Sequence, residues 1–188
     1  MTFEITNTPI PDVLILEPEV FEDNRGFFFE SFNQRNFEKA TRLDINFVQD
    51  NHSRSIKNVL RGLHYQIKHP QGKLVQVIQG EIFDVVVDLR YESPHFCKWV
   101  GITLSFENKL QLWIPPGFAH GFLVTSEIAD VNYKTTDYWY PEHECCIRWN
   151  DKTIGIEWPL SVERILNTKD QQGKRFENAE FFHDSPLS

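Results

Sequence analysis

Residues 83–90 read FDVVVDLR, in which apolar side chains fill every second position from Phe83 to Leu89. The same alternation recurs in VGITLS at residues 100–105 and in LQLWI at residues 110–114. A period of two is typical of β-strands whose two faces differ in polarity. Turn-forming stretches such as YESPH, FEN and PPG bound these segments. The pattern therefore predicts short antiparallel strands packed as a sandwich or a barrel.

Helical periodicity is scarce in the rest of the chain. Residues 33–43 (NQRNFEKATRL) are the best helix candidate, with Asn33 at the N-cap position, and residues 161–167 (SVERILN) are a second. No internal repeat, low-complexity segment or linker divides the 188 residues, and this length suits one domain with a sizeable core. We therefore expect residues 1–188 to form a single all-β domain with a few short peripheral helices.

The composition argues against several classes of protein. A formal net charge of -8 disfavours a nucleic-acid partner, because polyanion binding needs a basic surface. No apolar run reaches the roughly 18 residues that a membrane helix needs, and the residues after Met1 do not resemble a signal peptide. Of the three cysteines, Cys97, Cys145 and Cys146, the adjacent pair has poor geometry for a disulfide. We therefore expect packed, free thiols in the reducing cytosol.

Two histidines beside glycine turns, His64 in GLHYQ and His120 in PPGFAH, raise the question of a metal site. The Pro-x-Gly-x-x-His pattern that ends at His120 resembles the second cupin motif, and VIQGE resembles the turn that closes the first. Metal-binding cupins carry His-x-His followed by Glu, whereas this chain has His64-Tyr65-Gln66 and later a cation, Lys73. Catalytic metal sites generally use three protein ligands. Since only two clear ligands remain, we expect no metal.

Four further stretches carry a more specific resemblance. They are DNRGFFFESF (23–32), NVLRGLHYQ and PQGKLVQV (within 58–77), IPPGFAHGF (114–122), and YKTTDYWYPEHE and IRWND (within 133–151). From about Pro9 to Asp170, in order and spacing, the chain resembles the dTDP-4-dehydrorhamnose 3,5-epimerases. The resemblance implies a cytoplasmic jelly-roll cupin (double-stranded β-helix) that usually forms a homodimer and uses neither a metal nor an organic cofactor.

The implied reaction converts dTDP-4-dehydro-6-deoxy-D-glucose into dTDP-4-dehydro-L-rhamnose, a step in dTDP-rhamnose synthesis for cell-surface polysaccharides. The hydrogens on C3 and C5 flank the C4 ketone, so removal of either one gives an enolate. A base must take a proton from one face of the sugar, and an acid must return one to the opposite face. A positive group must stabilise the negative O4 in between.

The resemblance assigns these roles to four residues. His64 matches the general base, since an imidazole can accept a proton near neutral pH, and Asp170 in NTKDQQG matches the carboxylate that orients it. Tyr133 in VNYKTTDY matches the general acid, and Lys73 matches the cation beside the enolate oxygen. Without the family, Asp170 would be interpreted as a solvated loop acid, Tyr133 as a core aromatic and Lys73 as a strand-end lysine.

The resemblance also assigns binding roles. Arg25 and Arg61 match positions that bind the diphosphate, which guanidinium groups bind well. Phe21 and Tyr138 are candidates for stacking on thymine, and His120 is expected to bind the sugar or to support His64. Further polar contacts are expected from Glu30, Gln49, Asn51, Glu144 and Lys169. In the family's dimers part of the N-terminal segment can reach the neighbouring subunit, which would place Arg25 or Glu30 in the partner's site.

Other functions fit the same residues. The nearest is a single-position epimerase that acts only at C3 or only at C5 in another deoxysugar pathway, because pocket shape decides which carbon meets the base. A sugar-nucleotide ketoisomerase is disfavoured by the combination of RGLHYQ and NYK. A sugar-nucleotide-binding protein without catalysis would be free to lose one of the four catalytic matches, yet all four are present. A metal-dependent cupin oxygenase would need the ligands that this chain lacks.

Overall fold

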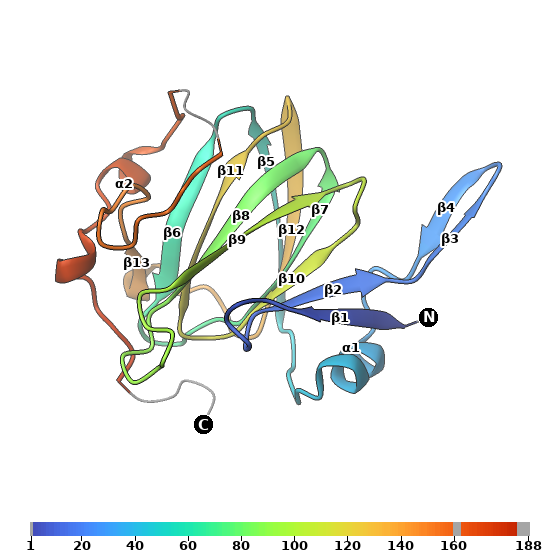
Figure 1. Cartoon of the computed structure of the whole chain (residues 1–188), viewed down its shortest axis with the longest axis horizontal. Coiled ribbons are helices and arrows are strands. Elements are labelled where there is room, and N and C mark those ends of the chain that lie inside the picture. The colour runs from blue at the N-terminus through green and yellow to red at the C-terminus, as the bar shows by residue number, and fades with distance from the viewer. Residues whose placement is uncertain (1, 160–162, 184–188) are drawn as a thin grey trace.

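The computed structural model describes residues 2–159 and 163–183. Within them, two antiparallel sheets pack face to face as a jelly roll, with a β-hairpin and two short α-helices at the edges (Figure 1). The six-stranded sheet has the order β1 (Phe3–Asn7), β2 (Leu14–Pro18), β10 (Gln111–Ile114), β7 (Lys73–Gln79), β12 (Ile128–Thr135) and β5 (Gln49–Ile56). The five-stranded sheet has the order β13 (Glu144–Cys146), β6 (Leu60–Gln66), β11 (Phe118–Val124), β8 (Glu81–Asp88) and β9 (Trp99–Ser105). The all-β prediction is confirmed.

The main core lies between the two sheets. Apolar side chains from both inner faces, among them Val75, Val86, Leu112, Phe122 and Val131, are almost completely buried there. Each residue belongs to a strand in which apolar side chains return to the inner face with the period of two. In β9 and β10 the alternation seen in the sequence thus reflects the burial of one sheet face against the other, whereas the alternating Val85 and Val87 of β8 lie on the outer face of their sheet.

A second apolar cluster covers the outer face of the five-stranded sheet. Val85 and Val87 of β8 point to this face, where Phe176 and Phe182 of the C-terminal segment pack over them. Figure 1 shows the segment in orange and red beside β6 and β13, with the short helices α2 (Thr168–Gln171) and η2 (Phe176–Asn178). The five-stranded sheet is therefore covered on both faces, and its cover brings Asp170 to the sheet.

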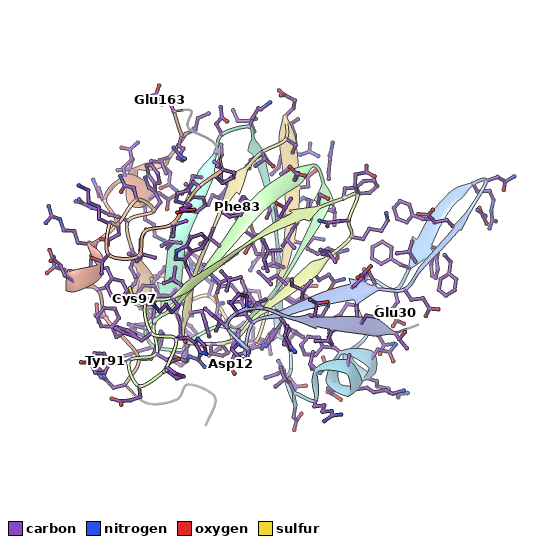
Figure 2. The ribbon with its side chains drawn as sticks, in the orientation of Figure 1. Asp12, Glu30, Phe83, Tyr91, Cys97 and Glu163 are labelled. Atoms are coloured by element: carbon purple, nitrogen blue, oxygen red, sulfur yellow. The ribbon has the colours of Figure 1, made fainter. Side chains whose placement is uncertain are left out.

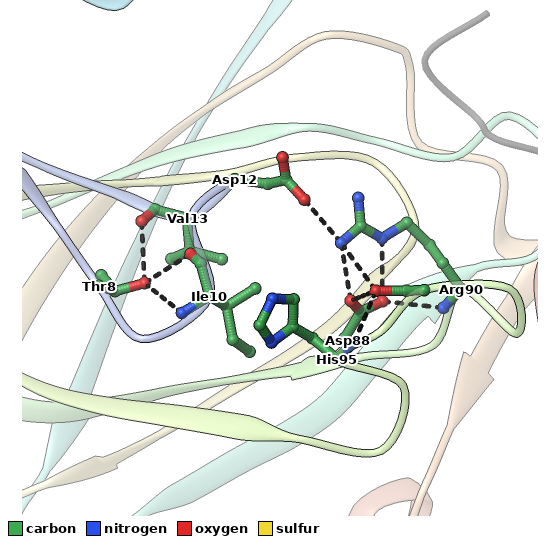
Figure 3. A network of polar contacts seen from close by, with 8 residues as sticks. Thr8, Ile10, Asp12, Val13, Asp88, Arg90 and His95 are labelled. Carbon is green, nitrogen blue, oxygen red and sulfur yellow. Dashed lines mark hydrogen bonds and ion pairs between the residues drawn. The ribbon is translucent and has the colours of Figure 1, made fainter.

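Because both faces of the five-stranded sheet are covered, two acidic side chains of β8 are buried. The sequence alternation sets Asp84 and Asp88 opposite the apolar positions, yet both side chains are fully buried. Arg90 pairs with Asp88 at 2.7 Å and with Asp12 at 2.8 Å, which ties the turn between β1 and β2 to the end of β8 (Figure 3). A buried carboxylate needs such a partner to offset its desolvation, and Asp84 has one in the site described below.

The first predicted helix is confirmed. Helix α1 (Gln34–Thr41) follows Asn33, whose side-chain oxygen accepts a hydrogen bond from the Asn36 N–H. The completely buried Phe37 packs edge-on against Trp113 on the outer face of the six-stranded sheet. Helix α1 thus closes the side of the sandwich that lies opposite the C-terminal segment.

The second predicted helix, at residues 161–167, is wrong where the structure describes it. Residues 161 and 162 lie outside the described residues, and 163–167 form no helix. Backbone groups of Ile165 instead bond to Asn58 and Leu60 at the start of β6. Seven residues give too short a pattern to separate a helix from a segment that pairs with a strand. Within the described part of the chain, no helix has the length and apolar character needed to cross a membrane.

Candidate active site

A cavity of about 390 Å³ lies between walls contributed by both sheets, with β5, β7 and β12 on one side and β6 and β11 on the other. The predicted residues that line it are Asn51, Arg61, His64, Lys73, His120, Tyr133, Glu144 and Lys169. Asp170 lies behind His64, at hydrogen-bonding distance. The fold therefore joins residues from widely separated parts of the chain in one polar cavity.

A close approach of β6 and β11 sets the floor of the site. The two strands are antiparallel, with His64 directly opposite His120. A Cβ at Gly62 would lie 2.5 Å from the Gly121 Cα atom and 2.7 Å from the carbonyl oxygen of His120. Gly62 also has a φ of +114°, which side-chain-bearing residues rarely adopt. The glycine in RGLH is therefore required for the two histidine strands to meet.

His64 and Asp170 form an imidazole–carboxylate pair. The Nε2 atom of His64 lies 2.5 Å from Oδ1 of Asp170. The side chain of Asp170 is 1% exposed, whereas that of His64 is 24% exposed and faces the cavity. Asn167, at the N-cap of α2, accepts a hydrogen bond from the Asp170 N–H at 2.7 Å and so fixes the position of the carboxylate. The predicted partnership of these two residues is present in the structure.

A second imidazole–carboxylate pair, His120 with Asp84, lies on the neighbouring strands. The Nε2 atom of His120 lies 2.8 Å from Oδ2 of Asp84 and 3.0 Å from Oδ1, and both residues are buried. Burial raises the pKa of Asp84, while the nearby His120 and Lys73 oppose the increase. His120 lines the cavity as expected, and Asp84 holds its ring in place.

Tyr133 faces the cavity from β12 in the opposite sheet. Its hydroxyl oxygen lies 2.9 Å from Oγ of Ser53 on β5. Burial raises the pKa of Tyr133, and the hydrogen bond to Ser53 offsets only part of the increase. The phenol consequently holds its proton at neutral pH and can act as a proton donor.

Lys73 begins β7 and points into the same cavity as Tyr133. The register pairs Thr135 with Lys73 and Tyr133 with Val75, so Lys73 and Tyr133 project from the same face of the sheet. Burial lowers the pKa of Lys73 from 10.5 to about 8, although the charges of Glu144 and Asp84 act against the decrease. The site therefore holds a poorly solvated ammonium group, which interacts strongly with any anion formed beside it.

The mouth of the cavity also carries a lysine–glutamate ion pair. Lys169 contacts Glu144, and the Trp139 indole donates a hydrogen bond to Glu144 at 3.2 Å. Burial raises the pKa of Glu144, but the bond and charge of Lys169 outweigh it and hold the pKa below its ordinary value. Arg61 lines the cavity and donates hydrogen bonds from Nε to Ser55 at 3.0 Å and from Nη2 to the carbonyl oxygen of Arg54 at 3.4 Å.

Five predicted binding residues do not line the cavity of their own chain. Phe21 and Arg25 belong to the hairpin of β3 (Val20–Asp23) and β4 (Gly26–Phe29), which projects from the body of the molecule (Figure 1). Arg25 is 86% exposed and pairs with Asp23. Glu30 lies at the base of this hairpin, where it accepts hydrogen bonds from side chains at the start of α1 (Figure 2).

The other two, Gln49 and Tyr138, lie next to the cavity. Gln49 donates a hydrogen bond to Oδ1 of Asn51 at 2.9 Å, and its Oε1 accepts one from the backbone N–H of Trp139 at 3.2 Å. Tyr138 is exposed beside Trp139. Both residues can therefore shape the rim, and their contact with a ligand stays a prediction.

Sequence reasoning missed several residues of the site. Asp84 gave a usable signal, because it is a charged residue inside an apolar run, IFDVVV. Ser53, Trp139, Asn167 and Cys146 gave none, since each acts through a neighbour that only the fold supplies.

A jelly roll in which an imidazole, a phenol and an ammonium group line one cavity fits the class of acid–base isomerases with the cupin fold. Residues 7–178 match the sequence model of the family described as dTDP-4-dehydrorhamnose 3,5-epimerase, and the chain belongs to this family. It is 61% identical over 177 residues to the dTDP-4-dehydrorhamnose 3,5-epimerase of Pseudomonas aeruginosa, a match that covers 94% of this chain and 98% of that protein. The resemblance found in the sequence is confirmed.

Solved structures agree with this assignment. The dTDP-6-deoxy-D-glucose-3,5-epimerase of Legionella pneumophila Philadelphia 1, solved in complex with dTDP-4-keto-L-rhamnose, is 48% identical, with a TM-score of 0.95 and coverage of 97% of this chain and 99% of that chain. ChmJ, a 3'-monoepimerase from Streptomyces bikiniensis solved in complex with dTDP-quinovose, is 29% identical, with a TM-score of 0.84 and coverage of 90% and 86%. The protein is a carbohydrate epimerase with the cupin fold.

Proposed function

We propose that the chain converts dTDP-4-dehydro-6-deoxy-D-glucose into dTDP-4-dehydro-L-rhamnose by inverting C3 and C5. The placement of base and acid on opposite walls of one cavity carries the proposal. His64 lies on β6 in the five-stranded sheet, and Tyr133 lies on β12 in the six-stranded sheet. Inversion needs removal of a proton from one face of the sugar and addition of another to the opposite face, and this arrangement meets that need.

In this proposal each proton-transfer step uses one particular atom. With its proton on Nε2 toward Asp170, His64 keeps the Nδ1 lone pair to accept the proton from C3 or C5. Asp170 stabilises the imidazolium that forms. The electron pair released from the C–H bond moves to O4 as an enolate, which the ammonium of Lys73 stabilises. Tyr133 then donates its hydroxyl proton to the opposite face of the same carbon, and exchange with solvent restores both groups.

The remaining cavity residues serve substrate binding in this proposal. His120, oriented by Asp84, binds the sugar near the ketone. Arg61 contacts the diphosphate, because it lines the cavity and its guanidinium has further N–H donors beyond those bonded to Ser55 and Arg54. Asn51 and Lys169 supply further polar contacts at the mouth. Tyr138 and the exposed Trp139 are placed to stack on the base.

The hairpin residues act in trans within a homodimer in this proposal. Phe21 is 48% exposed and Phe28 is 63% exposed, so the hairpin presents apolar rings that a second copy of the chain can cover. Arg25, at the hairpin tip, would then supply a cation to the partner's diphosphate site, with Glu30 at the base of the same arm. In the same proposal, residues 1–188 form a single domain. The protein works in the cytoplasm, where its cysteines stay as free thiols.

Subunit complementation tests the role in trans. Arg25→Ala and His64→Ala are prepared separately, then unfolded together and refolded to form mixed dimers. If Arg25 serves the partner's site, a mixed dimer combines an intact base with an intact hairpin in one of its two sites, and activity returns. If Arg25 serves its own chain, no site is intact and the mixture stays as inactive as its parents.

A single-position epimerase is the second candidate, and the likeness to the 3'-monoepimerase ChmJ favours keeping it. Incubation with dTDP-4-dehydro-6-deoxy-D-glucose in heavy water separates the two candidates, since each deprotonated carbon gains deuterium that NMR can locate. Label at both C3 and C5, with the inverted product trapped by a reductase, is the expected result. Label at one carbon, even after long incubation, would establish the single-position enzyme. His64→Ala is the control and should give no label at either carbon.

A further inference from the structure

A thiol lies beside the proposed base and takes no part in the proton transfer described above. Strand β13 pairs with β6 so that Cys146 stands directly opposite His64. The Sγ atom of Cys146 lies 3.9 Å from Oδ1 of Asp170. One imidazole nitrogen, one sulfur and one carboxylate oxygen of these residues all lie within 4.8 Å of one another.

The carboxylate of Asp170 has an unused ligand atom. Its Oδ1 contacts His64 and Cys146, whereas no hydrogen-bond donor among the described residues serves its buried Oδ2. Buried polar atoms nearly always have a partner, so an unpaired carboxylate oxygen in a residue that is 1% exposed points to a partner of another kind. A cation is the natural partner for such an oxygen.

We propose that His64, Cys146 and Asp170 form a binding site for a soft divalent cation such as Zn²⁺, which blocks the enzyme when it binds. Thiolate, imidazole and carboxylate are the three protein ligand types of zinc sites. The doubly charged ion with one thiolate and one carboxylate makes a neutral cluster, which suits a buried position.

The distances need only a small adjustment. A tetrahedral ion with bonds of about 2.0–2.2 Å to nitrogen and oxygen and about 2.3 Å to sulfur separates sulfur from oxygen by roughly 3.6 Å and nitrogen from oxygen by roughly 3.4 Å. The Cys146 Sγ to Asp170 Oδ1 distance of 3.9 Å is already close to this value. The His64–Asp170 pair, at 2.5 Å, must open by about 1 Å to admit the ion.

The proton balance explains why the bound ion inhibits. Bonds form from the ion to His64 Nε2, Cys146 Sγ and a carboxylate oxygen of Asp170, and the thiol releases its proton to solvent. The imidazole stays neutral by carrying its proton on Nδ1 instead of Nε2. Nδ1 can then no longer accept a proton from the sugar, and the contact between His64 and Asp170 is broken. The inhibition rests on the proposed role of His64, whereas the binding site does not.

Cadmium ion added alone to the purified full chain tests the site, because cadmium–thiolate bonds absorb in the ultraviolet. We expect binding of one ion per chain with a thiolate absorbance that Cys145→Ser and Cys97→Ser retain and Cys146→Ser loses. Cadmium NMR, whose chemical shift reports the number of sulfur ligands, should indicate one sulfur in the unaltered chain. A shift typical of oxygen ligands alone, or a thiolate band that survives Cys146→Ser, would overturn the proposal.

Zinc inhibition of turnover completes the test. We expect Zn²⁺ to inhibit the unaltered chain and Cys145→Ser alike, with at least about a tenfold higher inhibition constant in Cys146→Ser, each relative to its own uninhibited rate. If the chain shows the cadmium–thiolate band but incorporates no deuterium into the sugar, the metal site is supported and the proposed function is refuted. If deuterium incorporation is normal but the cadmium–thiolate band is absent, only the metal site is refuted. The same conclusion holds if Zn²⁺ inhibits Cys146→Ser as strongly as it inhibits the unaltered chain.

Discussion

Lys73 offers the sharpest test of the mechanism, because the cavity disfavours the charge that the reaction needs. Burial lowers the pKa of Lys73 from 10.5 to about 8, against the opposing charges of Glu144 and Asp84. At about 1.4 kcal/mol per pH unit, this difference corresponds to about 3 kcal/mol of free energy that disfavours the ammonium form. An enolate oxygen formed beside the ammonium relieves that cost, so the charge acts mainly in the transition state.

Two substitutions separate the charge of Lys73 from its titration. Lys73→Met should lose about 2–4 kcal/mol of transition-state stabilisation, which corresponds to a decrease in kcat of about 30-fold to about 900-fold. In the unaltered chain the ammonium is present below its lowered pKa and is lost above it, so kcat/KM should fall about tenfold per pH unit above about pH 8. Lys73→Arg keeps a positive charge at these pH values and should move the alkaline decrease upward.

The assay is steady-state turnover of dTDP-4-dehydro-6-deoxy-D-glucose from about pH 6 to about pH 10, with an excess of reductase that consumes the product at every pH. Circular dichroism of each variant controls for loss of fold. An alkaline decrease that stays in place in an active Lys73→Arg enzyme would assign it to another group. A Lys73→Met enzyme within about threefold of the unaltered chain would refute the cation's role.

Three other substitutions test the remaining parts of the argument. Asp170→Asn replaces the charge-assisted bond to His64 and should lower kcat/KM by roughly 10-fold to 150-fold, through loss of about 1.5–3 kcal/mol; a change below about threefold would contradict the pairing. Tyr133→Phe should reduce epimerisation by about 100-fold or more while deuterium exchange by NMR falls less, and normal turnover would exclude Tyr133 as the acid. Gly62→Ala should lower the free energy of unfolding in urea by about 2–5 kcal/mol, because its Cβ would meet β11 at 2.5 Å. The control Gly155→Ala, which also has a positive φ but no atom nearer than 3.8 Å, should cost about 1 kcal/mol, and equal losses would refute the steric argument.

The sequence by itself determined the strands and the start of α1. Alternating apolar residues record which side chains face the core, so β8, β9 and β10 could be located from pattern alone. Asn33 could be recognised as a cap because capping depends on residues only a few positions apart. His64, Lys73, His120 and Tyr133 could be selected because their motifs lie in single short stretches, and the structure places all four in one cavity.

Only the tertiary structure decided which of these residues act together. Asp170 is 106 positions from His64, and Asp84 is 36 positions from His120. Nothing local in the sequence connects such residues, because strand register and the path of the C-terminal cover bring them together. The same register sets Cys146 opposite His64, which turns an ordinary thiol into a candidate metal ligand.

The burial of Asp84 and the exposure of the hairpin both show what the sequence pattern of a strand cannot predict. A period of two indicates that one face of a strand is buried, but it does not tell what covers the other face. In β8 the C-terminal segment covers the face of Val85 and Val87, and the opposite face, which points to the other sheet, holds Asp84 and Asp88 as buried partners of a histidine and an arginine. In the β3–β4 hairpin the described residues of the same chain leave Phe21 and Phe28 exposed. Local pattern therefore fixes the elements, while the free energy of packing distant segments together decides the site.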